Sequence, residues 1–109
     1  MIMKHLLFLC SRNRLRSPTA EAVFANHPGI ETDSAGLSPD AEVRLSADQV
    51  EWADLILVME RIHQKRLKRD FGKSLAGKQV AVLNIPDQYG YMDPALVELL
   101  KARCARYLP

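Results

Sequence analysis

The sequence predicts an α/β fold in which a four-stranded, mostly parallel sheet carries helices on both faces. Three short apolar runs, residues 5–9, 54–59 and 79–85, have the length and continuity of strands that are buried on both sides. Segments with helix signals separate these runs, and alternating strands and helices form parallel sheets with right-handed crossovers. A chain of 109 residues is expected to fold as one domain, residues 1–109.

The first strand is followed by a polar loop and then by a helix. The run HLLFL, residues 5–9, is the strand. Ser17 is a good N-cap, and Pro18 suits the first helical turn, where its missing N–H is not needed. We expect this helix to continue until Pro28 and Gly29, a pair that stops helices.

A weaker strand and a short helix come next. Residues 30–35, IETDSA, are a weak strand candidate that ends at Gly36. Ser46 and Gln49 have the spacing of a capping box, in which each side chain satisfies the backbone N–H of the other residue. This spacing predicts a short helix over residues 47–53, ADQVEWA.

The second half of the chain is expected to supply two clear strands and two helices. Residues 54–59 form a strand, and a basic helix over residues 61–71 follows it and ends at Gly72. Residues 79–85 form the last strand, and residues 86–92 form a loop. Asp93 and Pro94 then open the final helix as its cap and first-turn proline. The apolar stripe of this helix is Leu96, Leu100, Cys104 and Tyr107.

Composition and charge narrow the classes of partner. The chain is 48% hydrophobic and 26% charged, as ordinary globular domains are, and its formal net charge of +2 demands no polyanionic partner. We therefore expect no nucleic-acid binding, and we interpret residues 61–71 as a solvated basic helix face. The apolar runs are far shorter than the roughly 20 residues that cross a bilayer, so no membrane partner is expected. The sequence leaves the oligomeric state open.

The cysteines and the N-terminal segment favour a reducing compartment. No apolar core with a cleavage site is present near the N-terminus, so no secretion signal is predicted. Cys10 and Cys104 are therefore expected to be free thiols in a cytoplasmic protein. Cys104 falls on the apolar stripe of the final helix, which predicts a buried and inert thiol.

The stretch CSRNRLRS, residues 10–17, places a thiol and three arginines between the first strand and the first helix. Helix N-termini and nearby cations favour the thiolate, the nucleophilic form of cysteine. The same features suit a phosphate group, because backbone N–H groups and a planar guanidinium bind anions. Parallel sheets carry their sites at the carboxyl ends of strands, where this stretch lies. The pattern indicates displacement at phosphorus by Cys10. A buried cysteine beside solvated arginines is the simpler alternative.

Residues 5–24, HLLFLCSRNRLRSPTAEAVF, resemble the signature of the low-molecular-weight protein tyrosine phosphatases, a C-x5-R-S loop that continues S-P-x-A-E. Three later segments resemble other parts of that family in the correct order: DSAGL (33–37), ADLILVMERIH (53–63) and residues 85–108. The resemblance covers most of the chain. It implies a flavodoxin-like, three-layer fold and a phosphomonoester hydrolase that needs neither a metal nor another cofactor.

The resemblance also implies a role for each matching residue. Cys10 would accept the phosphoryl group, Arg16 would bind it, and Asp87 would protonate the leaving oxygen and then activate water. Asn13 would hold the loop in shape, and Ser17 would donate a hydrogen bond to the thiolate. The other residues expected to bind phosphate or substrate are Ser11, Arg12, Arg14, Leu15 and Tyr89. The substrate would be a phosphotyrosine protein or another aryl phosphate.

The general acid has two candidates in this sequence. The family's acid is usually followed by proline, whereas Asp87 is followed by Gln88. An Asp-Pro pair occurs six residues later, at Asp93 and Pro94. Asp93 also fits an ordinary helix cap. The position of Asp87 directly after the last strand favours it as the acid.

Other departures from the family pattern bear on the substrate and on competing functions. Leu15 stands where the family often has a second cysteine, so Cys10 lacks a neighbouring thiol. Arg12 and Arg14 add cations that favour a highly charged substrate. Residues 37–51 are shorter than the family's corresponding segment, which predicts a more open site. Two alternatives remain: a non-catalytic protein that binds phosphorylated ligands, and an arsenate reductase, which would need further cysteines to pass electrons onward.

Overall fold

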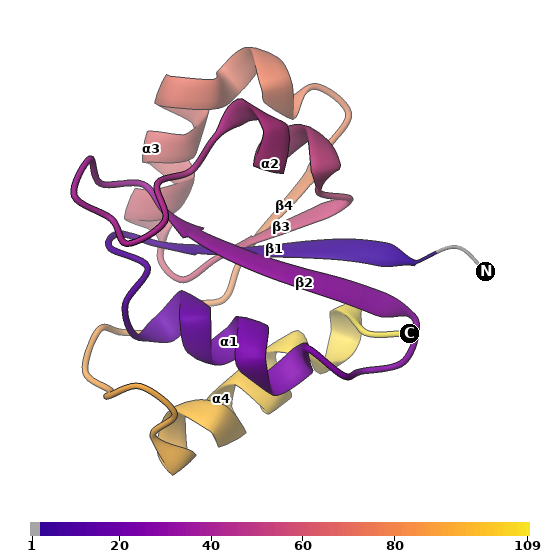
Figure 1. Cartoon of the computed structure of the whole chain (residues 1–109), viewed down its shortest axis with the longest axis vertical. Helices are drawn as coiled ribbons and strands as arrows, with labels where there is room; N and C mark the ends of the chain where they lie inside the picture. Colours follow the sequence, from indigo (N-terminus) through magenta and orange to yellow (C-terminus); the bar gives the residue numbers. More distant parts are fainter. Residues whose placement is uncertain (1–2) are drawn as a thin grey trace.

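Strands and helices alternate along the chain, as Figure 1 shows for the computed structural model. The structure describes residues 3–109, so residues 1–2 of the predicted domain lie outside the described part. The elements are β1 (Lys4–Cys10), α1 (Arg16–Phe24), β2 (Ile30–Gly36), α2 (Ala47–Trp52), β3 (Leu55–Val58), α3 (Arg61–Phe71), β4 (Gln79–Val82) and α4 (Pro94–Cys104). Short 3₁₀ turns follow α3 (Gly72–Leu75) and α4 (Ala105–Tyr107).

The four strands form one sheet in the order β2-β1-β3-β4, and all three strand pairs are parallel. The strand β1 lies between two neighbouring strands, and each of its faces contributes to a hydrophobic core, which explains its continuous apolar sequence. Its last residue, Cys10, is paired with Gly36 of β2, and Leu9 is paired with Val58 of β3. The carboxyl ends of three strands therefore meet at the position of Cys10.

Helices cover both faces of the sheet and complete the predicted three layers. Figure 1 shows α1 and α4 on one face and α2 and α3 on the other. Alternate side chains of β1 point to opposite faces. Leu6 and Phe8 belong to the core beneath α1 and α4, whereas Leu7 and Leu9 belong to the core beneath α2 and α3. All four side chains are fully buried. Among the described residues, no helix is both long and apolar enough to cross a membrane.

Two of the predicted helix caps are confirmed. Ser46 and Gln49 form a complete capping box at the start of α2. The Asp93 side chain accepts a hydrogen bond from the Ala95 N–H at 2.9 Å, and Pro94 is the first residue of α4. Both motifs act over three or four residues, so their geometry follows from local sequence.

The start of α1 differs from the prediction. The helix begins at Arg16, so Ser17 is the second helical residue and is not the N-cap. Leu15 occupies the cap position and provides no side-chain hydrogen bond. The Ser17 hydroxyl is instead turned toward the Cys10 thiol.

The elements β3, β4 and α4 are also shorter than the sequence predicts. The strand β3 lacks both Asp54 and Met59, and the Asp54 carboxylate accepts a hydrogen bond from the His5 N–H at 2.8 Å. The strand β4 ends at Val82, because Asn84 adopts a left-handed conformation with φ of 56° that interrupts the extended backbone. Tyr107 lies in the 3₁₀ turn beyond α4 and not on the helix itself.

Candidate active site

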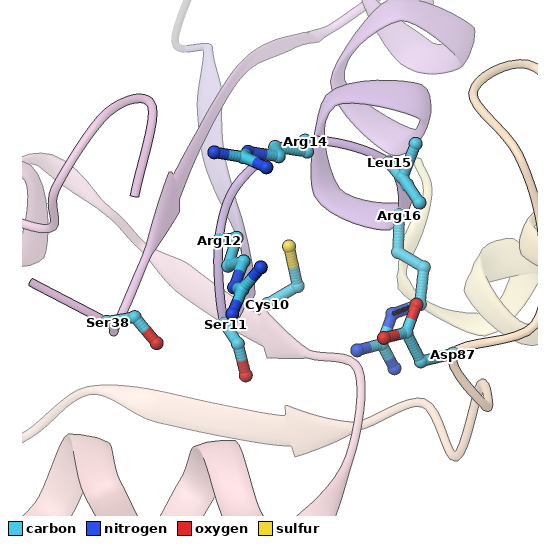
Figure 2. Close-up of a pocket in the computed structure, with 8 residues that line it drawn as sticks. All are labelled: Cys10, Ser11, Arg12, Arg14, Leu15, Arg16, Ser38 and Asp87. Carbon is cyan, nitrogen blue, oxygen red and sulfur yellow. Dashed lines mark ion pairs between the residues drawn. The ribbon is translucent and has the colours of Figure 1, made fainter. Parts of the chain in front are cut away.

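A pocket of about 500 Å³ lies at the carboxyl end of β1 (Figure 2). Three segments that are far apart in sequence contribute to it: the stretch from the end of β1 to the start of α1, the loop after β2 and the loop after β4. Its lining residues are Cys10, Ser11, Arg12, Arg14, Leu15, Arg16, Ser38 and Asp87. Seven of the ten residues that the sequence predicts for the site thus come together there. Asn13 and Ser17 lie just behind this lining, and only Tyr89 is elsewhere.

The Cys10 side chain lies in the middle of this group and is held by polar contacts. Its residue is only 4% exposed. The Ser17 Oγ lies 2.9 Å from the Cys10 Sγ, and the Asn13 backbone N–H donates to the same sulfur at 3.3 Å. Both contacts favour negative charge on the sulfur, because each can present a hydrogen to it. Cys10 is therefore held in place at the carboxyl end of β1 by contacts to the loop and to α1.

Asn13 fixes the shape of the loop that carries Cys10. Its φ of 55° lies in the left-handed region, which asparagine tolerates better than most residues. Its Nδ2 donates to Ser17 Oγ at 3.0 Å and to Ser34 Oγ at 2.9 Å. Ser34 in turn donates to the carboxylate of Glu21. The loop is therefore tied both to α1 and to the neighbouring strand β2.

Arg16 is buried and contacts residues of two segments that are distant from it in sequence, the start of α3 and the loop after β4. Its guanidinium forms an ion pair with Glu60 and donates to the Ile85 carbonyl at 2.8 Å. Its Nε lies 3.7 Å from the Asp87 Oδ1. At 4% exposure, the arginine is held in one position, which suits recognition of a phosphate by a planar fork. The sequence signal for Glu60 is an acidic residue soon after the carboxyl end of β3.

His63 joins the nucleophile loop to the acidic partner of Arg16. Its Nδ1 accepts a hydrogen bond from the Glu60 N–H at 3.0 Å, so the ring proton resides on Nε2. That nitrogen lies 3.0 Å from Ser11 Oγ. Burial is the main cause that lowers the pKa of His63 from 6.5 to about 4, and the nearby charge of Arg16 adds to it. The imidazole is therefore neutral at physiological pH.

The two candidates for the general acid occupy different places. Asp87 lines the pocket with Cys10, and its side chain is 65% exposed. Asp93 is not among the eight described residues that line the pocket, and its carboxylate caps α4. Figure 2 shows the Asp87 carboxylate beside the Arg16 guanidinium, on the same side of the Cys10 sulfur. The geometry thus favours Asp87.

Tyr89 differs from the prediction that it lines the substrate pocket. Its half-buried side chain packs against the hydrophobic core beneath α1 and α4. Tyr89 is not among the described residues that line the pocket. Leu15, in contrast, does line the pocket and is 38% exposed.

The loop after β2 packs closely on the nucleophile loop. The Leu37 N–H donates to the Cys10 carbonyl at 3.0 Å, and the Ser38 N–H donates to the Ser11 carbonyl at 2.9 Å. A Cβ on Gly36 would lie 2.6 Å from the Ser11 carbonyl oxygen, so only glycine permits this approach. The short segment after β2 therefore forms one wall of the pocket through backbone contacts.

The second thiol belongs to Cys104, which is not among the described residues that line this pocket. Cys104 is fully buried on α4, and burial raises its pKa to about 12. Such a thiol is inert, as the sequence predicts. An arsenate reductase needs accessible thiols to carry electrons onward, so this environment does not favour that alternative.

Comparisons with known proteins agree with this geometry. The low-molecular-weight protein-tyrosine-phosphatase Ptp of Acinetobacter johnsonii is 30% identical in an alignment 117 positions long, which covers 82% of each protein. No family model matches the sequence.

Solved structures show the same fold at lower sequence identity. The YwlE arginine phosphatase from Geobacillus stearothermophilus is 22% identical and has a TM-score of 0.78, covering 95% of this chain and 90% of its own. The tyrosine phosphatase Wzb from Escherichia coli K30, in complex with phosphate, is 20% identical with a TM-score of 0.78, covering 97% and 96%. The chain therefore belongs to the low-molecular-weight protein tyrosine phosphatase family.

Proposed function

We propose that this protein is a metal-independent phosphomonoester hydrolase that acts on phosphotyrosine through a cysteinyl-phosphate intermediate at Cys10. The observation that carries the proposal is the buried Cys10 thiol, which shares one pocket with Arg16 and Asp87. The name of the Acinetobacter johnsonii relative, a protein tyrosine phosphatase, supports phosphotyrosine as the substrate.

In the first step, the Cys10 thiolate attacks phosphorus, and the bond between phosphorus and the ester oxygen breaks. Arg16 and the N–H groups of the loop stabilise the charge on the phosphoryl oxygens, which is why no metal is required. Asp87, protonated at this stage, donates its proton to the leaving oxygen. The hydrogen bond from Ser17 stabilises the thiolate before attack.

In the second step, water replaces Cys10 on phosphorus. Asp87 is now a carboxylate and takes a proton from the water, whose oxygen forms the new bond to phosphorus. The sulfur–phosphorus bond breaks, so the thiolate is restored and inorganic phosphate is released. The hydrogen bonds from Ser17 and Asn13 make the sulfur a better leaving group in this step.

The proposal is tested by turnover of para-nitrophenyl phosphate in the presence of EDTA. We expect turnover by the wild type and none above background by Cys10→Ser. Cys104→Ala removes the other thiol and should retain turnover, so it controls for general effects of cysteine loss. Turnover that persists in Cys10→Ser would refute the role of Cys10. A wild type that binds phosphate but does not turn over would favour the non-catalytic alternative.

Substrate class and compartment are tested separately. A phosphotyrosine peptide should be hydrolysed faster than its phosphoserine counterpart, because a phenol is the better leaving group. Equal rates would contradict the assignment to phosphotyrosine.

We also propose the cytoplasm as the compartment, since Cys10 must stay reduced to act as a nucleophile. Fractionation of cells that express the protein from its own promoter would check this.

A further inference from the structure

Two arginines face the pocket on the side away from Arg16. Figure 2 shows Arg12 and Arg14 on the Ser38 side of the Cys10 sulfur, while Arg16 and Asp87 lie on the other side. Their side chains are 61% and 52% exposed, so solvent and ligands reach both guanidinium groups. The pocket lining as a whole carries three arginines and one carboxylate. A single phosphate group bound at Arg16 leaves two of these cations for other anions.

The partners of these two arginines come from one short loop. Asp40 Oδ2 lies 3.7 Å from Arg12 Nε, and Glu42 Oε1 lies 3.2 Å from Arg14 Nε. The Glu42 N–H donates to the Arg12 carbonyl at 2.9 Å, so backbone contacts hold the two carboxylates beside the arginines. Exposed ion pairs of this kind are weak, because solvent screens both charges. An incoming anion can therefore replace either carboxylate.

The basic character of this side extends past the pocket rim. Arg66 of α3 donates to Ser38 Oγ at 3.5 Å, and Ser38 lines the pocket. A ligand group on the Ser38 side of Cys10 thus lies near the guanidinium groups of Arg12 and Arg14. The opposite side carries Asp87, the only acidic side chain among the described residues that line the pocket. Because Arg12 and Arg14 lie on the Ser38 side and the carboxylate on the other, a second negative charge on the substrate is expected on the Ser38 side.

We propose that Arg12 and Arg14 form a second anion subsite, and that the preferred substrate is a phosphomonoester with a second anionic group next to the ester. This inference rests on the proposed function and names its substrate class. The second group is a carboxylate or a phosphate, because guanidinium groups bind both by paired hydrogen bonds. Asp40 and Glu42 occupy the subsite when no such ligand is bound.

Two matched pairs of substrates test the subsite. The first compares 3-carboxyphenyl phosphate with 3-carbamoylphenyl phosphate, which differ by one charge at nearly constant shape. The second compares phosphotyrosine peptides flanked by glutamate or by glutamine. We expect kcat/KM to be about fivefold higher for the charged member of at least one pair, and the advantage to shrink with added salt. The pair that responds shows whether the second anion sits on the ring or on a neighbouring residue.

Charge-removing variants assign the preference to specific side chains. The double variant Arg12→Gln/Arg14→Gln should bring the kcat/KM ratio of the responding pair close to one. The matched control Lys101→Gln/Arg106→Gln removes two exposed charges near the C-terminal end of α4 and should keep the wild-type ratio. A ratio near one for both pairs in the wild type would overturn the proposal, as would an unchanged ratio in the double arginine variant.

Removal of the competing carboxylates gives an independent test with the opposite sign. Asp40→Asn/Glu42→Gln should raise the kcat/KM ratio of the responding pair above the wild-type value, because the substrate anion no longer has to displace a carboxylate from either arginine. An unchanged or lower ratio would count against the subsite, even if the double arginine variant did not fold. Absence of any para-nitrophenyl phosphate turnover would instead refute the proposed function. The two failures are therefore distinguishable.

Discussion

The buried imidazole of His63 should make the stability of this protein depend on pH between its pKa values in the folded and unfolded chain, about 4 and 6.5. The residue is 1% exposed, and its Nδ1 accepts the Glu60 N–H while its Nε2 faces Ser11 Oγ. Protonation would place a second hydrogen between Nδ1 and the Glu60 N–H, where two donors would oppose each other. Geometry and burial thus both disfavour the charged ring.

The expected magnitude follows from the pKa of His63, which falls from 6.5 to about 4 on folding. Between these values the unfolded chain binds a proton that the native state does not, so stability decreases as pH falls. The full effect is about 3 kcal/mol, present above the unfolded pKa and lost below the folded one. Most of it, about 2.5 kcal/mol, should disappear between about pH 7.5 and about pH 4.5.

Urea denaturation at a series of pH values measures this effect in wild type and His63→Gln. The variant should be less stable at neutral pH by about 1–3 kcal/mol, because it disturbs two buried hydrogen bonds. Its stability should fall much less toward pH 4.5, so the difference between the two proteins should shrink. His27→Gln removes an imidazole from the loop between α1 and β2 and serves as the matched control. Parallel pH profiles for wild type and His63→Gln would refute the reasoning.

Three further predictions address the site itself. Asp87→Asn should slow turnover of alkyl phosphates by about 100-fold or more and para-nitrophenyl phosphate much less, because an activated leaving group needs less protonation. Equal losses in steady-state kinetics would contradict that role. Gly36→Ala would place a Cβ 2.6 Å from the Ser11 carbonyl oxygen, so urea denaturation should show a loss of about 1–3 kcal/mol, with lower kcat. A Gly36→Ala variant as stable as wild type would show that the loop shifts to make room for the methyl group. Peroxide should inactivate Cys10 irreversibly, since Leu15 supplies no thiol to trap the sulfenic acid. Full recovery of activity with dithiothreitol would disprove this.

Local sequence predicted much of the architecture because its signals act over a few residues. The apolar run of β1 indicates burial on both faces, and the sheet confirms it, with Leu6 to Leu9 fully buried. The caps of α2 and α4 were identifiable because each contacts a backbone N–H only two or three residues away. Residues 10–17 likewise contain the thiol, the loop asparagine and the arginine within eight consecutive positions.

The partners of those residues could not be predicted, because they come from other elements. Glu60 is 44 residues from the arginine that it binds, and His63 is 52 residues from Ser11. No periodicity or motif connects such pairs. The position of Tyr89 was not predictable either. Its place two residues after Asp87 does not indicate that its ring packs on the core.

The sequence by itself determined that this chain forms a parallel α/β sheet with a thiol and arginines at the end of its first strand. Tertiary structure alone decided how the site is completed. The order of the strands brings the ends of β1, β2 and β3 together, so that Ser34, Ser38 and Glu60 reach the nucleophile loop. It also decided that Asp87 lines the pocket while Asp93 caps α4. The reason is physical: caps and apolar runs depend on neighbours in sequence, whereas a buried ion pair depends on which strands lie side by side.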